Sequence, residues 1–181
     1  MNDKEIRKYH FFFSWQDESQ EKWLEGLSRK GLHLEKAGWL GRFTFVEGSA
    51  GDYAYRLDFY KDKQAEDYLQ LIQDAGWEYL GKQGGWHYWR KEVTGGRVPE
   101  LFTDILSKRQ KYQRLLTFSA TSSPGAAVMY IIGAAIFKTH PGLHPEWFIV
   151  LYLSLNMAWL LVGGLNSVMV YRRINQLKKG E

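Results

Sequence analysis

The residues best suited to chemistry are an arginine and an aspartate two positions apart, Arg56 and Asp58, in an otherwise aromatic segment. Residues two apart on a β-strand point to the same side, so we expect their charged groups to lie close together. We also expect Arg90, in a later strand-like segment, to join them. A polar cluster among aromatic rings can orient a bound ligand. The alternative is a cross-strand ion pair, which contributes little where it is exposed.

Aromatic residues surround this cluster. The first 107 residues contain 20 Phe, Trp and Tyr residues, and they predict an aromatic sheet face that binds a ligand or a partner chain. The alternative is an aromatic-rich core, because aromatic stripes are usually buried. The residues of the predicted site are Trp39, Tyr55, Arg56, Asp58, Trp86, Tyr88 and Arg90.

No set of residues indicates catalysis, a metal site or a cofactor. The chain has no cysteine, which excludes thiolate catalysis and Cys-type zinc sites. His140 and His144 have the spacing of a helical metal pair, but Pro141 and Pro145 exclude a helix there. No nucleophile or base stands out either. We therefore predict no cofactor and no enzyme.

An internal repeat must position the aromatic residues. Residues 21–34 and 66–79 are similar at an offset of 45, and each has an apolar helical face. Gly31 and Gly76 are expected to end these helices in a left-handed conformation. Strand-like runs flank each helix, which gives strand–helix–strand–strand repeats over residues 8–47 and 53–91. The predicted fold is α+β: an antiparallel sheet with both helices on one face, followed by a transmembrane helical hairpin.

Two uncharged stretches predict this hairpin. Residues 115–137 and 147–171 each exceed the roughly 20 apolar residues that cross a bilayer as a helix. Residues 138–146 would form a short outer loop. The alternative is a buried helical hairpin of a soluble protein. The basic residues flanking the two stretches place both chain ends in the cytoplasm and are expected to contact lipid headgroups; they are Lys108, Arg109, Lys111, Arg114, Arg172, Arg173, Lys178 and Lys179.

Small and polar residues on one side of each predicted span favour close packing of the two helices. Homo-oligomerisation through the remaining small faces is an alternative use. No acidic or basic residue lies within either span, so an ion pathway is not expected. The predicted packing residues are Ser119, Ser123, Ala127, Asn156, Gly163 and Ser167.

The charge distribution agrees with a cell-membrane protein. Residues 1–107 hold 15 Lys and Arg against 18 Asp and Glu, so the positive charge is concentrated beside the membrane. This leaves no basic surface for nucleic acid on the soluble domain. The predicted organisation is a cytoplasmic α+β domain (1–92), a linker and basic juxtamembrane helix (93–114), two spans with the loop between them, and a basic tail (172–181).

Several motifs carry a family resemblance. They are residues 11–15, 21–24, 30–34, 55–58, 74–79 and 85–91. With these motifs the chain resembles the bacterial family of domain of unknown function number 2812, over most of residues 8–114. The resemblance implies no activity, but such proteins are often encoded beside PadR-like transcriptional regulators. The tandem strand–helix–strand–strand units also resemble effector-binding domains that cup amphipathic small molecules; fold likeness alone does not fix function.

These observations predict a membrane-anchored cytoplasmic sensory or regulatory module. Its aromatic face would bind a cytoplasmic regulator or a small amphipathic ligand. The alternative is an accessory or structural subunit of a membrane complex, in which the helical hairpin is the working part.

Overall fold

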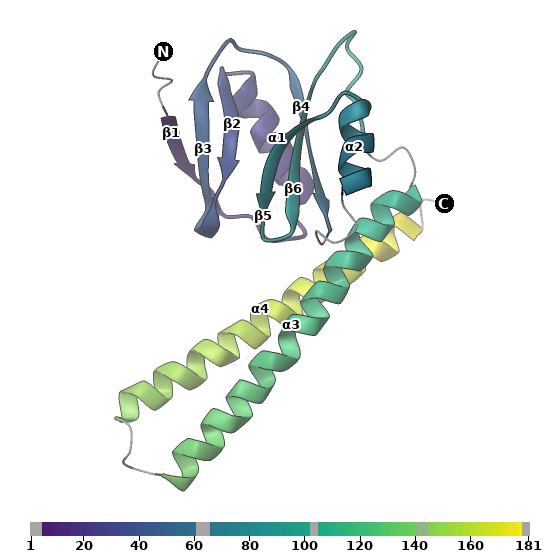
Figure 1. The fold of residues 1–181 in the computed structure, drawn as a ribbon. Coiled ribbons are helices and arrows are strands. Elements are labelled where there is room, and N and C mark those ends of the chain that lie inside the picture. The colour runs from purple at the N-terminus through teal and green to yellow at the C-terminus, as the bar shows by residue number, and fades with distance from the viewer. Residues whose placement is uncertain (1–4, 61–65, 102–104, 141, 143–144, 179–181) are drawn as a thin grey trace. The chain divides into compact units, whose positions relative to one another are not determined.

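The computed structural model describes residues 5–60, 66–101, 105–140, 142 and 145–178 (Figure 1). It divides into two units, Met1–Lys111 and Tyr112–Glu181, each described by itself. The first unit is a mixed α+β domain, as predicted.

The first unit contains two antiparallel sheets of three strands, where the sequence predicted one sheet. In chain order its elements are β1 (Glu5–Tyr9), α1 (Asp17–Ser28), β2 (Leu32–Ala37), the 3-10 turn η1 (Trp39–Gly41), β3 (Arg42–Glu47), β4 (Tyr53–Phe59), α2 (Glu66–Asp74), β5 (Glu78–Gln83) and β6 (Trp86–Glu92). The strand orders are β1-β3-β2 and β4-β6-β5.

The two sheets are adjacent through β2 and β5, which do not pair with each other. Both strands carry an irregularity, between Leu34 and Lys36 in β2 and between Tyr79 and Gly81 in β5. A bulge bends a strand and interrupts its ladder. Each irregularity lies in the pairing with the central strand of its own sheet, β3 or β6.

Left-handed glycines end both helices, as predicted. Gly31 has φ 76° and Gly76 has φ 84°, values that favour glycine. A Cβ on Gly31 would lie 2.6 Å from the carbonyl oxygen of Gly48, so this position also lacks space for a side chain. The chain can therefore turn directly from α1 into β2.

Two hydrophobic clusters place the helices on opposite faces of the second sheet. Tyr55 and Leu57 of β4 pack in one cluster with Leu24 of α1. The same cluster contains Phe45 of the first sheet. Ala54 belongs to a separate cluster with Ile72 of α2, Trp77 and Trp89. Because consecutive strand residues point to opposite sides, α1 and α2 cover opposite faces. The prediction that both helices lie on one face is wrong for this sheet.

The second unit consists of α3 (Ile105–Thr139) from Tyr112 onward, together with α4 (Glu146–Lys178). Hydrogen bonds between described residues join these antiparallel helices. Asn166 Nδ2 donates to Ser119 Oγ at 2.8 Å, and the Tyr152 hydroxyl donates to the carbonyl of Met129 at 2.7 Å. A Cβ on Gly133 would collide with the Tyr152 ring, so the absence of a side chain there lets the ring pack.

Helix α4 is long and apolar enough to cross a membrane, and its apolar part is not buried within the structure. In the described part of α3, the apolar helical segment is Ala127–Thr139, which is shorter than a span. The structure therefore supports membrane association through α4. The predicted stretches 115–137 and 147–171 lie inside α3 and α4.

Candidate functional site

A pocket of about 300 Å³ lies in the first unit where residues 10–14, which follow β1, meet the turn at residues 38–41. The second sheet contributes Gln83, Trp86 and Tyr88, and α1 contributes Asp17 and Gln20. Both sheets and α1 thus contribute to its walls. We call this cavity the aromatic pocket.

The backbone holds the two segments of the pocket together. The amide of His10 donates to the carbonyl of Gly41 at 2.9 Å. Gly41 has φ 71°, and a Cβ there would lie 2.5 Å from the carbonyl oxygen of His10. Only glycine allows this close approach. Leu40, beside it, has φ 55°, an uncommon conformation for a residue with a side chain.

Exposed apolar side chains surround the mouth of the pocket. Trp39 is 75% exposed and Leu40 is 87% exposed. Of the seven large hydrophobic residues strongly exposed in the described part of the first unit, five lie at this end of the first sheet. An exposed apolar patch of this kind often marks a binding site. We call the five residues the aromatic rim: Tyr9, Phe11, Phe13, Trp39 and Leu40.

A neutral polar pair lies inside the aromatic pocket. Gln20 Nε2 donates to the Tyr88 hydroxyl at 2.9 Å. Burial raises the pKa of Tyr88 to about 12, although the hydrogen bond from Gln20 lowers it in part. The hydroxyl therefore keeps its proton at neutral pH, so it can donate a hydrogen bond to an acceptor atom of a ligand. The pocket suits a molecule with an apolar body and a hydrogen-bonding group.

An ionic network lies beside the pocket, along the free edge of β4. Glu21 accepts the backbone N–H of Leu57 at 2.8 Å, and Glu25 accepts that of Tyr55 at 3.4 Å. These carboxylates take the place of a neighbouring strand. Because an unpaired strand edge invites aggregation, this covering protects the sheet.

Two cations complete the network. Arg56 lies 2.7 Å from Glu25 and 3.9 Å from Glu21. Lys111, at the start of α3, lies 2.6 Å from Asp17 and donates to the carbonyl of Leu57 at 3.1 Å. Each acid of α1 in the network therefore has a cation within ion-pair distance, so the network is a structural brace.

Burial changes the acid–base properties of this network. Burial raises the pKa of Glu21 to about 7, and the positive charge of Lys111 offsets only part of the effect. Burial alone would lower the pKa of Arg56, but the charges and hydrogen bonds of Glu21, Glu100 and Glu25 raise it. Glu21 thus titrates near neutral pH.

The predicted site residues separate into two groups. Trp39, Trp86 and Tyr88 line the aromatic pocket. Tyr55 is 1% exposed in the core, and Arg56 is part of the ionic network. The predicted open aromatic face is therefore largely core, and the accessible aromatics lie at its end.

The expected joining of Arg90 with Arg56 and Asp58 is wrong. Arg90 is the cross-strand partner of Tyr55, so it lies on the opposite face of the sheet from both of them. It pairs with Glu78 at 2.6 Å instead. Asp58 accepts hydrogen bonds from the amide of Phe59 and the hydroxyl of Tyr68.

The prediction that Lys111 contacts lipid headgroups is also wrong. Its side chain is 2% exposed and is held by Asp17. Lys108 pairs with Glu18 at 3.1 Å and is partly accessible. The other predicted headgroup residues differ in exposure: Arg172 and Lys178 are exposed, Arg109, Arg114 and Arg173 are half-buried, and Lys179 lies outside the described residues.

Of the predicted packing residues, Ser119 accepts a hydrogen bond from the other helix, donated by Asn166. Asn156 and Ser167 donate to carbonyls of their own helix, those of Tyr152 and Gly163. Ala127 is half-buried, and the side chain of Ser123 lies outside what the structure describes. The sequence interpretation missed Asn166, Gly133 and the ring of Tyr152, all within the predicted spans.

The interpretation also missed the acids of the ionic network and most of the rim. Asp17, Glu21 and Glu25 recur at spacing four, which places them on one side of a helix. Such a like-charge stripe is unfavourable unless partners neutralise it, and that was the available signal. For Phe11 and Leu40, no sequence signal distinguished exposed from buried positions.

Among the described residues, no group of three or more His, Asp or Glu side chains could hold a metal ion. Comparison with curated proteins finds no match, and comparison with solved structures finds none either. A family model does match, over residues 16–123, which is more than half of the chain. The chain therefore belongs to the family described as Protein of unknown function (DUF2812).

Proposed function

We propose that this protein is a membrane-anchored sensory module, not an enzyme, that binds a small amphipathic molecule in the aromatic pocket. The observation that carries the proposal is the combination of exposed rings at the mouth with the neutral Gln20–Tyr88 pair inside. The volume of about 300 Å³ suits a small molecule rather than a folded partner. Apolar rings would take the body of the ligand, and the Tyr88 hydroxyl would orient its polar group.

The proposal includes two membrane spans and a cytoplasmic first unit. The apolar character of α4 supports the membrane attachment. The uncharged stretches 115–137 and 147–171, with basic residues on their outer flanks, support a two-pass arrangement with both ends inside. A soluble transcriptional regulator is the proposed recipient of the signal, in line with the gene neighbourhood that the resemblance implies.

The ionic network provides a route from the pocket to α3. Asp17 both lines the aromatic pocket and pairs with Lys111. The Asp17–Lys111 pair can be intact or broken. A ligand that binds one of these two states more tightly would shift the position of the start of α3. The binding site and the start of α3 therefore share one buried carboxylate.

Intrinsic tryptophan fluorescence of the full-length protein in mild detergent tests the ligand proposal. The protein is titrated with a panel of amphipathic compounds. At least one compound should bind saturably, and Trp39→Ala should weaken it about tenfold, equivalent to about 1.4 kcal/mol. Leu71→Ala is the control, because Leu71 is similarly exposed but lies on α2. An affinity unchanged by Trp39→Ala would remove the pocket from the proposal.

A second candidate is an accessory subunit of a membrane complex, in which α3 and α4 are the working part. The Asn166–Ser119 and Tyr152–Met129 hydrogen bonds favour it, since they give the helix pair a defined packing. Replacing both helices with an unrelated hairpin separates the two candidates. Retained signalling supports the sensory module, and lost signalling supports the accessory subunit.

A further inference from the structure

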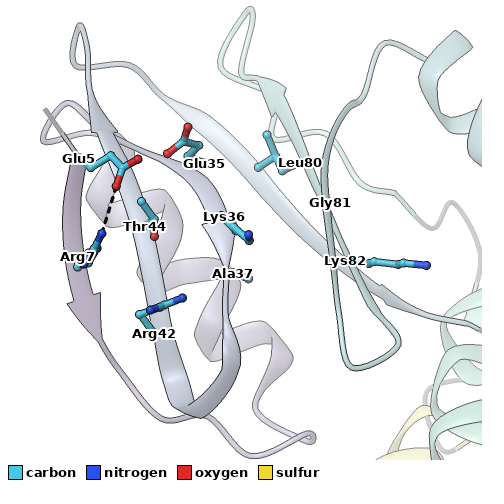
Figure 2. Close-up of a pocket in the computed structure, with 10 residues that line it drawn as sticks. All are labelled: Glu5, Arg7, Glu35, Lys36, Ala37, Arg42, Thr44, Leu80, Gly81 and Lys82. Atoms are coloured by element: carbon cyan, nitrogen blue, oxygen red, sulfur yellow. Dashed lines mark ion pairs between the residues drawn. The ribbon is translucent and has the colours of Figure 1, made fainter. Parts of the chain in front are cut away.

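A second, larger pocket of about 520 Å³ lies on the outer face of the first sheet (Figure 2). Strands β1, β3 and β2 form its floor, and residues 80–82 of β5 form one wall. This face of the sheet is opposite to the one that Phe43 and Phe45 present to the core. The pocket is therefore separate from the aromatic pocket.

The strand register concentrates positive charge in this second pocket. Arg7 and Lys36 are both cross-strand partners of Thr44, so the three form one row across the sheet. Arg42 points to the same side two residues before Thr44 on β3. Neighbouring strands are about 4.8 Å apart, so these cations can surround one ligand. We call Arg7, Lys36, Arg42 and Thr44 the basic row.

The balance of charge in the second pocket favours an anion. Four cations line it, the fourth being Lys82, against the two acids Glu5 and Glu35. Glu5 lies 3.6 Å from Arg7 on the same strand. Guanidinium, ammonium and hydroxyl groups together match the oxygens of a phosphate.

The aromatic rim continues directly from the basic row. Tyr9 is the cross-strand partner of Arg42, and Trp39 and Leu40 belong to the turn η1 that immediately precedes β3. Aromatic side chains favour the interface between lipid and water, and basic side chains are attracted to anionic headgroups. A soluble phosphate compound would use the cations of the basic row but would not contact the exposed Trp39 and Leu40 beside it. A lipid surface uses both.

We propose that the outer face of the first sheet is a docking site for anionic lipid, with the basic row on the headgroup phosphate and Trp39 and Leu40 in the interface. The docking rests on the membrane attachment under Proposed function but not on the ligand of the aromatic pocket. It holds the first unit against the bilayer with the mouth of that pocket facing the lipid.

An environment-sensitive fluorophore at position 40 tests the docking. The chain has no cysteine, so Leu40→Cys gives a single labelling site. The labelled full-length protein is reconstituted into vesicles of phosphatidylcholine, alone or mixed with phosphatidylglycerol. The label should shift to the blue only in the anionic vesicles. A label at Leu71→Cys, on α2, is the control and should not respond.

Charge variants connect the response to the basic row. Lys36→Gln and Arg42→Gln should each lower the ratio of docked to undocked protein about fivefold. Both side chains are exposed, so the fold should be unaffected. Equal signals in both vesicle types, or no effect of either variant, would overturn the proposal. So would displacement of the label by soluble glycerol phosphate, which would identify a soluble anion as the ligand.

The two proposals fail separately. If the amphipathic panel gives no binding but the label at position 40 responds, only the ligand proposal falls. If the panel binds and the label does not respond, only the docking falls.

Discussion

The two sheets of the first unit have the same strand order but different surroundings. The first sheet packs one face on α1 and leaves the other open, whereas the second sheet is covered on both faces. The first sheet and the turn at residues 38–41 supply the basic row and the aromatic rim, while the second supplies the covered strand β4. The comparison indicates that the first sheet is the accessible half of the domain, whereas the second sheet mainly supports it and adds Gln83, Trp86 and Tyr88 to the aromatic pocket.

The difference is visible in the alternation of single strands. In β3 the buried residues Phe43 and Phe45 alternate with more accessible ones such as Thr44. In β4 every residue from Ala54 to Phe59 is buried. A strand covered on both faces and along its free edge has no accessible side, so charged residues there need partners inside the protein.

The largest effect should come from a buried lysine on β4, compared with an accessible lysine on β3. Ala54→Lys puts an unpaired charge into the cluster under α2, where Ala54 is fully buried, and should prevent folding at a cost of several kcal/mol. Thr44→Lys, on the open face, meets the solvated cations Arg7 and Lys36 across the strands and should still cost only about 1 kcal/mol. Urea unfolding followed by tryptophan fluorescence checks both. Similar costs for the two variants would contradict the difference between the sheets.

The next largest effect concerns the two ion pairs between α1 and the start of α3. Lys111→Met leaves Asp17 buried without its cation and should cost about 3–5 kcal/mol. Lys108→Met removes the partly exposed pair with Glu18 and should cost at most about 1 kcal/mol. Unfolding midpoints of the full-length variants in one detergent measure the difference. A loss of stability below about 1 kcal/mol in Lys111→Met would show that the network does not brace the second sheet.

Sequence reasoning predicted the α+β class and the left-handed ends at Gly31 and Gly76, because these depend on local patterns. It could not predict the division into two sheets, since whether β2 and β5 pair with each other depends on long-range contacts. It placed Trp39, Trp86 and Tyr88 in the site but could not separate them from the buried Tyr55. That separation depends on which face α1 covers, which is a long-range property.

The third effect is a pH dependence of stability that belongs to Glu21. Its pKa rises from 4.5 to about 7 in the folded protein, so the folded state binds the proton more tightly than the unfolded state. Stability should therefore fall as pH rises from about 4.5 to about 7 and then level off, by up to roughly 3 kcal/mol. Glu21→Gln should flatten this interval, as measured by urea unfolding at a series of pH values. An unchanged pH profile in Glu21→Gln would assign the dependence to another group.

The smallest effect should be a gain in stability in the accessible half. Leu40→Gly relieves the left-handed conformation at φ 55° and removes an exposed apolar side chain. It should raise stability by about 1 kcal/mol while weakening ligand binding or lipid docking. Thermal unfolding and the vesicle response, with a labelled Trp39→Cys replacing the label at position 40, report the two properties. A loss of stability would show that the conformation of Leu40 serves the fold.

The most direct test of the central claim is native mass spectrometry of the full-length protein, released from its own membranes in mild detergent. The account predicts a single small-molecule adduct on the wild type. The double variant Trp39→Ala and Tyr88→Phe, which keeps the core ring of Tyr88, should lose this adduct. The same adduct on both proteins, or a wild type without any adduct, would contradict the claim that the aromatic pocket is the ligand site.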